Sequence, residues 1–378
     1  MDEPSRVVIT PDALDELLEV LARRGFRVVA PVVRDGAILF EERDGDAPLP
    51  VGWTDRQEAG SYRLERRADE ARFGFAVGPH SWKQFLFPAR LRLWRARRDA
   101  ADGLDFEVEP RDERPYAFVG VRSCDLHAIA TQDRVFMGGR FVDDDYASRR
   151  ENAFIVAVNC FEPGGTCFCV SMGTGPRVDA GYDLALTELL EGEHRVLVEV
   201  GTDRGADVLR ELARRPAHAA DLAAAERAVA GAAERMGRVL ETADLPGLLT
   251  ANPEHPRWED VADRCLSCGN CVLVCPTCFC STVEDHTDLA GAEAERWRTW
   301  DTCFSVDHSY IHGGSVRAGT RSRYRQWLTH KLDTWHDQFG TSGCVGCGRC
   351  ITWCPVAIDI TAEVAAIRAD GGADGATG

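Results

Sequence analysis

The chain has 378 residues and a formal net charge of −17. This length suggests two or three domains with well-buried cores, and the acidic balance argues against a general nucleic-acid binder, which would carry a basic surface. The N-terminus lacks the basic start and apolar run of an export signal, and no stretch approaches the roughly eighteen apolar residues of a membrane helix. We therefore expect a cytoplasmic protein that has no membrane span and binds no nucleic acid.

The first 217 residues predict an α/β domain. Residues 10–25 show the apolar periodicity of a helix that Thr10 caps and Gly25 ends. Two strands should follow at 27–33 and 37–42, joined by an Asp35-Gly36 turn. Further along, short apolar runs alternate with helical patterns, which is typical of α/β folds. The expected strands are 116–122, 153–160 and 195–201, and the expected helices are 124–136 and 205–215.

Residues 218–262 predict a helical connector. Their composition shifts to Ala, Glu and Arg, and an apolar stripe recurs at alternating spacings of three and four. The stripe consists of Leu222, Ala225, Val229, Ala232, Met236 and Val239. Residues 263–368 form the cysteine-dense region, and the small, polar residues 369–378 predict a disordered tail.

Fifteen cysteines in a chain without an export signal favour metal or redox use over a disulfide framework. The strongest signal is "CLSCGNCVLVCP", which starts at Cys265 and recurs as "CVGCGRCITWCP" from Cys344. Each follows the C-x₂-C-x₂-C-x₃-C-P spacing of bacterial 4Fe-4S ferredoxins. Zinc sites usually pair two C-x₂-C hooks, so the third and fourth cysteines and the proline fit zinc poorly.

In two-cluster ferredoxins the fourth cysteine of each run binds the other cluster, because it begins a separate segment that faces away from the first three. The spacing therefore predicts two 4Fe-4S clusters with crossed ligands. One set is Cys265, Cys268, Cys271 and Cys354, and the other is Cys344, Cys347, Cys350 and Cys275. The long interval between the motifs contains the helical pattern of residues 323–339. We expect an α+β protein in which a helical two-cluster ferredoxin-like domain follows the α/β domain.

Four cysteines of the α/β domain suggest a third metal cluster. Cys124 follows one expected strand, Cys160 ends another, and Cys167 and Cys169 lie just beyond it in "TCFC". If the two strands are parallel neighbours, these thiols converge at the strand ends, where α/β folds place ligands. Four thiols there could hold an Fe-S cluster or another metal, whereas isolated buried cysteines would only pack.

A second "TCFC" contains Cys278 and Cys280, and Cys303 follows. Three cysteines are one short of a full set. They could shield a neighbouring cluster, join a metal with an outside ligand such as His286 or His308, or pack as apolar side chains. All three interpretations stay open.

A basic run interrupts the otherwise acidic chain between residues 317 and 331. It contains Arg317, Arg321, Arg323, Arg325 and Lys331. A solvated helix face is the simpler interpretation. The alternative is a docking patch that also steadies anionic clusters and raises their potentials.

The chain resembles the iron-sulfur β subunit of cytosolic nickel-iron hydrogenases of the sulfhydrogenase type, and it is also similar to one of the subunits of anaerobic sulfite reductase. The strings that carry the resemblance are "WKQFLFP", "GVRSCDLHAI", "NCFEPGGTCFCVSMGTGP", "RCLSCGNCVLVCPTCFC", "WDTCF" and "CVGCGRCITWCP". The resemblance implies an electron-transfer subunit of a soluble complex. Its partners would be a flavin- and NAD(P)-binding subunit and the nickel-iron hydrogenase subunits, or a sulfite reductase counterpart.

No Ser/His/Asp or Cys/His catalytic set and no flavin or NAD fingerprint stand out in the sequence. We therefore expect an electron-transfer subunit of an oxidoreductase rather than the catalytic chain. The alternative is a catalytic sulfite- or sulfur-reductase subunit in which an open cluster near Cys278, Cys280 and Cys303 binds substrate. A redox or iron sensor is a third hypothesis.

Overall fold

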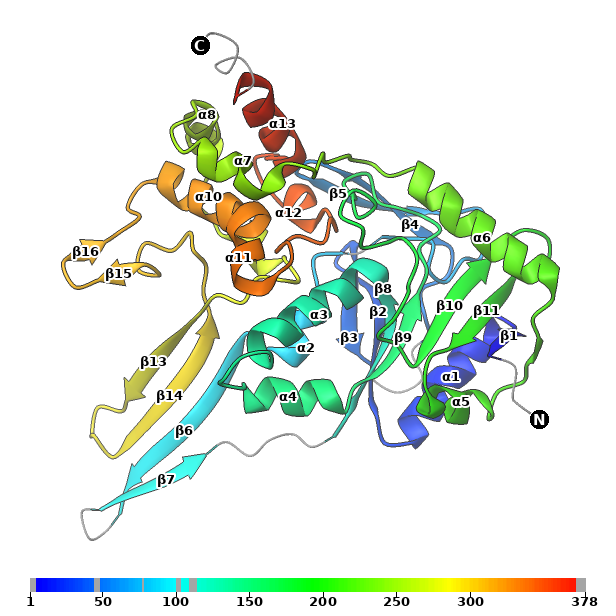
Figure 1. The fold of residues 1–378 in the computed structure, drawn as a ribbon. Coiled ribbons are helices and arrows are strands. Elements are labelled where there is room, and N and C mark those ends of the chain that lie inside the picture. Colours follow the sequence, from blue (N-terminus) through cyan, green and yellow to red (C-terminus); the bar gives the residue numbers. More distant parts are fainter. Residues whose placement is uncertain (1–4, 44–47, 77, 100–102, 109–113, 372–378) are drawn as a thin grey trace.

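A mixed sheet lies at the centre of the N-terminal part of the chain. The computed structural model describes residues 5–43, 48–76, 78–99, 103–108 and 114–371. Within these residues the largest sheet has the spatial order β12-β1-β11-β10-β9-β8-β2-β3 (Figure 1). The strand bounds are β1 Arg6–Ile9, β2 Arg27–Arg34, β3 Ala37–Glu42, β8 Tyr116–Arg122, β9 Phe154–Val158, β10 Leu184–Leu189, β11 Arg195–Val200 and β12 Arg215–Pro216.

Strands β10, β9, β8 and β2 run parallel to one another, and the outer strands pair antiparallel. Every residue of β8 and β9 is buried, which matches the continuous apolar runs that mark parallel strands covered on both faces. The expected β2–β3 hairpin is confirmed. Its turn residues Asp35 and Gly36 have φ angles of 52° and 73°, as a type I′ turn requires.

Helices cover both faces of this sheet. Helices α1 (Asp12–Arg23) and α5 (Asp203–Leu209) share one apolar core with alternate strand residues such as Phe154 and Val156. The residues between them, such as Ile155, face the opposite side, where α3 (Ser123–Phe136) and α4 (Asp144–Glu151) pack. This arrangement confirms the expected α/β organisation.

Helix α6 (Ala219–Glu234) packs against β10 and β11 but is shorter than its apolar stripe predicted. Met236 and Val239 lie beyond its end, and Val239 is exposed. The helix stops because the following residues bind the first TCFC loop instead. The N–H of Arg238 donates to the carbonyl of Cys167 at 2.9 Å.

Short helices surround the two ferredoxin motifs and bury a separate apolar core that contains Trp258, Leu328, Ile351 and Val364. Their bounds are α7 Leu245–Ala251, α8 Arg257–Arg264, α9 Asn270–Leu273, α10 Thr320–Thr329, α11 Trp335–Phe339, α12 Arg349–Thr352 and α13 Ile360–Gly371. A single π-helical turn, η1 (His330–Thr334), joins α10 to α11. The helix expected at 323–339 is thus present with a widened turn. Another short helix, α2 (Lys83–Leu86), lies in the N-terminal part.

A second sheet, of order β13-β14-β6-β7, extends away from the body of the molecule (Figure 1). Its strands are β6 Arg90–Arg98, β7 Leu104–Val108, β13 Ser281–Thr287 and β14 Glu293–Trp300. β14 runs antiparallel to β6, with Glu295 opposite Arg95. This sheet joins segments that the sequence assigned to different domains, and its β13 and β14 lie where only helix was anticipated. Two hairpins complete the described strands: β4 Trp53–Glu58 with β5 Ser61–Arg66, and β15 Tyr310–Ile311 with β16 Gly314–Ser315.

The expected tail at 369–378 begins differently from the prediction. Residues 369–371 continue helix α13, and residues 372–378 lie outside the described residues. Among the helices that the structure describes, none is long and apolar enough to cross a membrane.

Candidate iron-sulfur centres

The two ferredoxin loops share one backbone conformation. Ser267 and Gly346 occupy the same position in the two motifs, and their φ angles are 52° and 65°. Two positions later, Gly269 and Gly348 have φ angles of 75° and 73°. Each loop then enters a short helix, α9 or α12. This left-handed geometry turns the chain twice within seven residues, so that three thiols face the inside of the loop.

Backbone N–H groups donate to the ligand sulfurs, as expected for loops that hold an anionic cluster. The N–H of Ser267 lies 3.4 Å from Cys265 Sγ, and the N–H of Gly346 lies 3.4 Å from Cys344 Sγ. Cys354 Sγ accepts from the N–H of Ile358 at 3.3 Å. These donors would also stabilise added negative charge on a bound cluster.

The first crossed set lines a single cavity. Cys265, Cys268, Cys271 and Cys354 all border one small cavity of about 30 Å³, which Cys350 and apolar side chains such as Phe304 also line. Burial raises the pKa of the Cys271 thiol, and the thiolates of the other three members raise it further. The structure therefore brings together the fourth cysteine of one motif and the first three of the other.

The second crossed set assembles in the same way. Burial raises the pKa of the Cys350 thiol, and Cys344, Cys347 and Cys275 are its next strongest influences. In the described part of the chain, no three His, Cys, Asp or Glu side chains converge closely enough for one metal ion. A cubane binds its thiolates through four different irons, so its ligands stand further apart than those of a single ion. Each set brings together the four thiols that a cubane would need.

Lys331 distinguishes the second set from the first. Its side chain is buried, and its ammonium group donates to Cys275 Sγ at 3.2 Å. Burial alone would lower the pKa of Lys331, but the thiolates of Cys275 and Cys278 raise it well above its ordinary value. The basic run is therefore not a uniform solvated face. Arg323 is also buried, whereas Arg321 and Arg325 lie nearer the surface.

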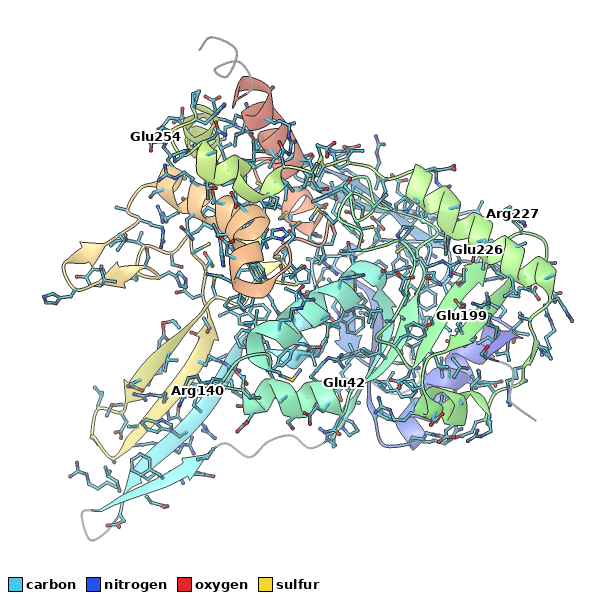
Figure 2. All side chains as sticks on the ribbon, in the orientation of Figure 1. Glu42, Arg140, Glu199, Glu226, Arg227 and Glu254 are labelled. Carbon is cyan, nitrogen blue, oxygen red and sulfur yellow. The ribbon has the colours of Figure 1, made fainter. Side chains whose placement is uncertain are left out.

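The more exposed arginines of the basic run form ion pairs. Arg321 and Arg325 reach Glu254 at 2.7 and 3.2 Å, close to the outer ends of α8 and α10 (Figure 2). Arg323 instead donates to the backbone carbonyl oxygens of Phe304 and Ala318. These arginines therefore link structural elements to one another.

The four cysteines of the α/β part converge as the strand order requires. β8 and β9 are parallel neighbours, Cys124 is the second residue of α3, which starts directly after β8, and Cys160 follows β9. Cys160 and Cys169 are among the groups that influence the pKa of Cys167, which burial raises well above the ordinary thiol value. Burial raises the pKa of Cys124 well above the ordinary thiol value, and Cys169 is among the groups that raise it further. The Arg122 guanidinium lies 3.8 Å from Cys160 Sγ.

The first TCFC loop packs directly on the second ferredoxin loop. The N–H of Phe168 donates to the carbonyl of Gly346 at 2.8 Å, and a Cβ added to Gly346 would lie 2.7 Å from the Cα of Cys169. Cys124, Cys169 and Cys347 belong to one buried apolar cluster. The candidate third centre is therefore adjacent to the second crossed set.

The second TCFC loop lies on the other side of that set. Thr277 Oγ1 donates to the carbonyl of Gly343 at 2.6 Å, and the contact with Cys278 lowers the pKa of the Cys275 thiol well below its ordinary value. Cys278, Cys280 and Cys303 share a cavity of about 350 Å³ with His308 and Lys331. The two TCFC stretches thus flank the same ferredoxin loop.

His308 joins the second TCFC loop, and His286 does not. His308 Nδ1 pairs with Asp301 Oδ2 at 2.9 Å, and its contact with Cys280, helped by Asp301, raises the pKa of the imidazole to about 9. Contacts with Cys303 and His308 lower the pKa of Cys280 to about 4. His286 lies on exposed β13, where its partner is Glu284 at 3.5 Å. Asp301 and Arg349 are contributors that the sequence did not single out at these sites, whereas Lys331 belongs to the basic run for which an effect on the clusters was one of the two interpretations.

These features define a two-cluster iron-sulfur protein, and comparison with known proteins agrees. Residues 264–358 match the family described as a 4Fe-4S dicluster domain. The chain is 32% identical over 285 residues to the beta subunit of sulfhydrogenase 2 from Pyrococcus furiosus, covering 73% of this chain and 79% of that relative. No solved structure matches the chain. The protein belongs to the family of sulfhydrogenase beta subunits, which confirms the resemblance seen in the sequence.

Proposed function

We propose that this chain relays electrons through two 4Fe-4S clusters as the iron-sulfur subunit of a multi-subunit oxidoreductase. The observation that supports the proposal is that the first three cysteines of each motif lie near the fourth cysteine of the other, so that each motif would supply three ligands to one centre and one to the other. The dicluster match and the sulfhydrogenase relative support the same function. Bound clusters would supply one-electron transfer.

The side chains around these sites serve binding and insulation. The first set lies against Phe304, Tyr324 and Trp327, which give one side of the cavity an apolar wall. Backbone N–H groups at Ser267 and Gly346 orient the sulfurs. Apolar burial and hydrogen bonding of this kind set the potential at which a cluster accepts an electron.

A third centre at Cys124, Cys160, Cys167 and Cys169 belongs to the proposal. All four thiols are buried or nearly so, and burial raises their pKa values, so bound metal would have to displace their protons. Their contact with the second ferredoxin loop would make this centre a continuation of the same electron path. Cys278, Cys280 and Cys303 stay weaker candidates for metal.

The proposed partners are a flavin- and NAD(P)-binding subunit and nickel-iron hydrogenase subunits, in the cytoplasm. The name of the relative, a sulfhydrogenase beta subunit, supports membership of a multi-subunit complex. The alternative of a catalytic sulfite or sulfur reductase subunit is not favoured by that relative or by the dicluster match.

The test is the iron and acid-labile sulfide content per chain after anaerobic isolation. Roughly eight irons correspond to two cubanes and roughly twelve to three. Cys268→Ser and Cys347→Ser each remove a ligand of one crossed set, and Cys169→Ser removes one from the third candidate. We expect each substitution to lower the iron content by about one cluster, with the other signals kept in the electron paramagnetic resonance (EPR) spectrum.

Two outcomes would count against these assignments. A wild-type protein with eight irons that are unchanged in Cys169→Ser would remove the third centre. A protein without acid-labile sulfide would overturn the electron-relay function itself.

A further inference from the structure

Lys331 makes the one hydrogen bond from a charged side chain to a ferredoxin-type cysteine in the described part of the chain. Its ammonium group lies 3.2 Å from Cys275 Sγ, 3.2 Å from Thr277 Oγ1 and 3.0 Å from the carbonyl oxygen of Gly343. These three acceptors match the three N–H bonds of an ammonium group. The group is therefore held in place with its charge directed at the sulfur.

The fold places this charge in the interior. Lys331 belongs to the π-helical turn η1, and its side chain is only 2% exposed. A π turn accommodates one extra residue within a helix and is frequently found at functional sites. Within the described residues Lys331 has no carboxylate partner, so its charge acts on the sulfur of Cys275 and is not shared with a neighbouring acid.

A second buried lysine reinforces the charge at this position. Lys83 is 4% exposed and donates to the carbonyl oxygens of Val272 and Leu273, just before Cys275. Its ammonium group lies 4.1 Å from the ring centre of Trp300. Lys83 thus contributes charge without contacting a ligand sulfur, which makes it a natural control for Lys331.

The first crossed set lacks an equivalent. Among the described residues, the hydrogen bonds to its sulfurs come from backbone N–H groups, at Ser267 for Cys265 and at Ile358 for Cys354. The nearby Arg264 is neutralised by Glu363 at 2.9 Å. The two sets therefore share the loop geometry but differ in the charge placed beside them.

We propose that Lys331 is a positioning residue that raises the reduction potential of the cluster held by Cys344, Cys347, Cys350 and Cys275 above that of its neighbour. Reduction of a 4Fe-4S cluster adds one electron, and hence one negative charge, to the cluster and its thiolates. A fixed cation at a ligand sulfur stabilises the reduced state more than the oxidised one, because the interaction is strong in a low-dielectric interior.

The consequence is a preferred direction of electron transfer between the two clusters. One electron that enters at the cluster held by Cys265, Cys268, Cys271 and Cys354 would pass to the second cluster, so the first is oxidised and the second reduced. The inference rests on the proposed function, since it needs both clusters to be present.

The test is an EPR-monitored redox titration of the anaerobically isolated protein. Lys331→Met removes the charge and the hydrogen bond while keeping an unbranched apolar side chain. We expect the second cluster's potential to fall, shifting its electron-exchange equilibrium with the first cluster by about tenfold, which is about 59 mV for a one-electron couple. The first cluster's potential should stay unchanged and serves as an internal reference.

Two further variants separate hydrogen bonding from general charge. Lys331→Arg keeps a cationic donor and should restore most of the potential. Lys83→Met removes an equally buried lysine that has no sulfur contact and should shift the second cluster by less than Lys331→Met does. An equal or larger effect of Lys83→Met would refute the specific role of Lys331.

The wild-type protein provides a test that does not depend on whether a Lys331 variant folds. The signal perturbed by Cys347→Ser must be reduced at a higher potential than the signal perturbed by Cys268→Ser. The reverse order would overturn the inference, as would an unchanged second potential in Lys331→Met with both clusters intact. Absence of the clusters would instead reject the proposed function.

Discussion

Replacing Asp125 with alanine would leave a fully buried guanidinium without its partner. Arg349, in the second ferredoxin motif, lies 2.9 Å from Asp125 Oδ1 at the start of α3, and the two side chains are 0% and 1% exposed. Arg349 Nε also donates to the carbonyl of Gly78 at 3.1 Å. The pair therefore links the α/β part of the chain to the cluster region.

The expected cost follows from burial. Removing one partner of a buried ion pair costs about 3 to 5 kcal/mol, mostly because the remaining charge stays desolvated. In Asp125→Ala the hydrogen bond to Gly78 and the nearby cysteines Cys347 and Cys124 would remain beside Arg349, but its carboxylate partner would be gone. If the pair breaks before the rate-limiting step of unfolding, about 3 kcal/mol corresponds to roughly hundredfold faster unfolding.

The assay is the rate at which cluster absorbance is lost at a fixed guanidinium concentration under anaerobic conditions. Unfolding that releases a cofactor is not a two-state equilibrium, so a rate is the appropriate measure. The double variant Asp125→Ala/Arg349→Met removes both charges and should unfold more slowly than Asp125→Ala alone. Arg349→Met alone leaves the carboxylate buried and should also unfold faster than the wild type.

An unchanged unfolding rate in Asp125→Ala would refute this reasoning. So would a double variant that loses its clusters faster than either single variant, because the penalty is attributed to an unpaired charge and not to lost packing. The wild type, the two single variants and the double variant together form a double-mutant cycle. This cycle measures the coupling energy between the two residues, which we expect to be at least about 1.5 kcal/mol.

Three other predictions follow from packing and exposure. Gly346→Ala should lower the iron content per chain, because the new Cβ would lie 2.7 Å from the Cα of Cys169 at a φ of +65°; Gly340→Ala, at +67° with no atom within 4 Å, measures the backbone strain alone. Trp258→Ala, at a position 0% exposed, should destabilise the protein by about 3 to 5 kcal/mol, measured as faster unfolding in guanidinium. An iron chelator should remove the cluster of the set that contains exposed Cys268 before the other one, and EPR spectra taken during the reaction would follow the order.

The local features of the fold could be predicted from the sequence because their causes are local. The turn at Asp35 and Gly36 requires left-handed φ angles that these residue types tolerate, and the strand Tyr116–Arg122 is a continuous apolar run. The spacing of the ferredoxin cysteines likewise reflects a loop that closes on itself. The neighbouring positions of β8 and β9 could be predicted from the rule that successive strands usually pair.

Features that depend on distant partners could not be predicted in the same way. Strand β14 is rich in charged residues and becomes a strand because β6 pairs with it. For the basic run the sequence left open a solvated helix face and a patch that steadies the clusters, and the choice could not be made locally because Lys331 contacts Cys275, 56 positions earlier. The apolar stripe of α6 overran the helix because Arg238 binds the first TCFC loop. In each case tertiary contacts overrode the local pattern.

The pairing of β14 with β6 also means that β6 is synthesised well before its partner strand. Glu295 and Arg95 are 200 positions apart, so at about 5 to 20 residues per second a ribosome needs roughly 10 to 40 s to deliver the second strand after the first. During this time one edge of β6 has no partner and is open to wrong pairing. Its arginines repel a second copy of the same edge, and Glu293 and Glu295 later neutralise Arg92, Arg95 and Arg97. The arginines of β6 thus oppose wrong pairing of the newly synthesised strand until β14 of the same chain pairs with it.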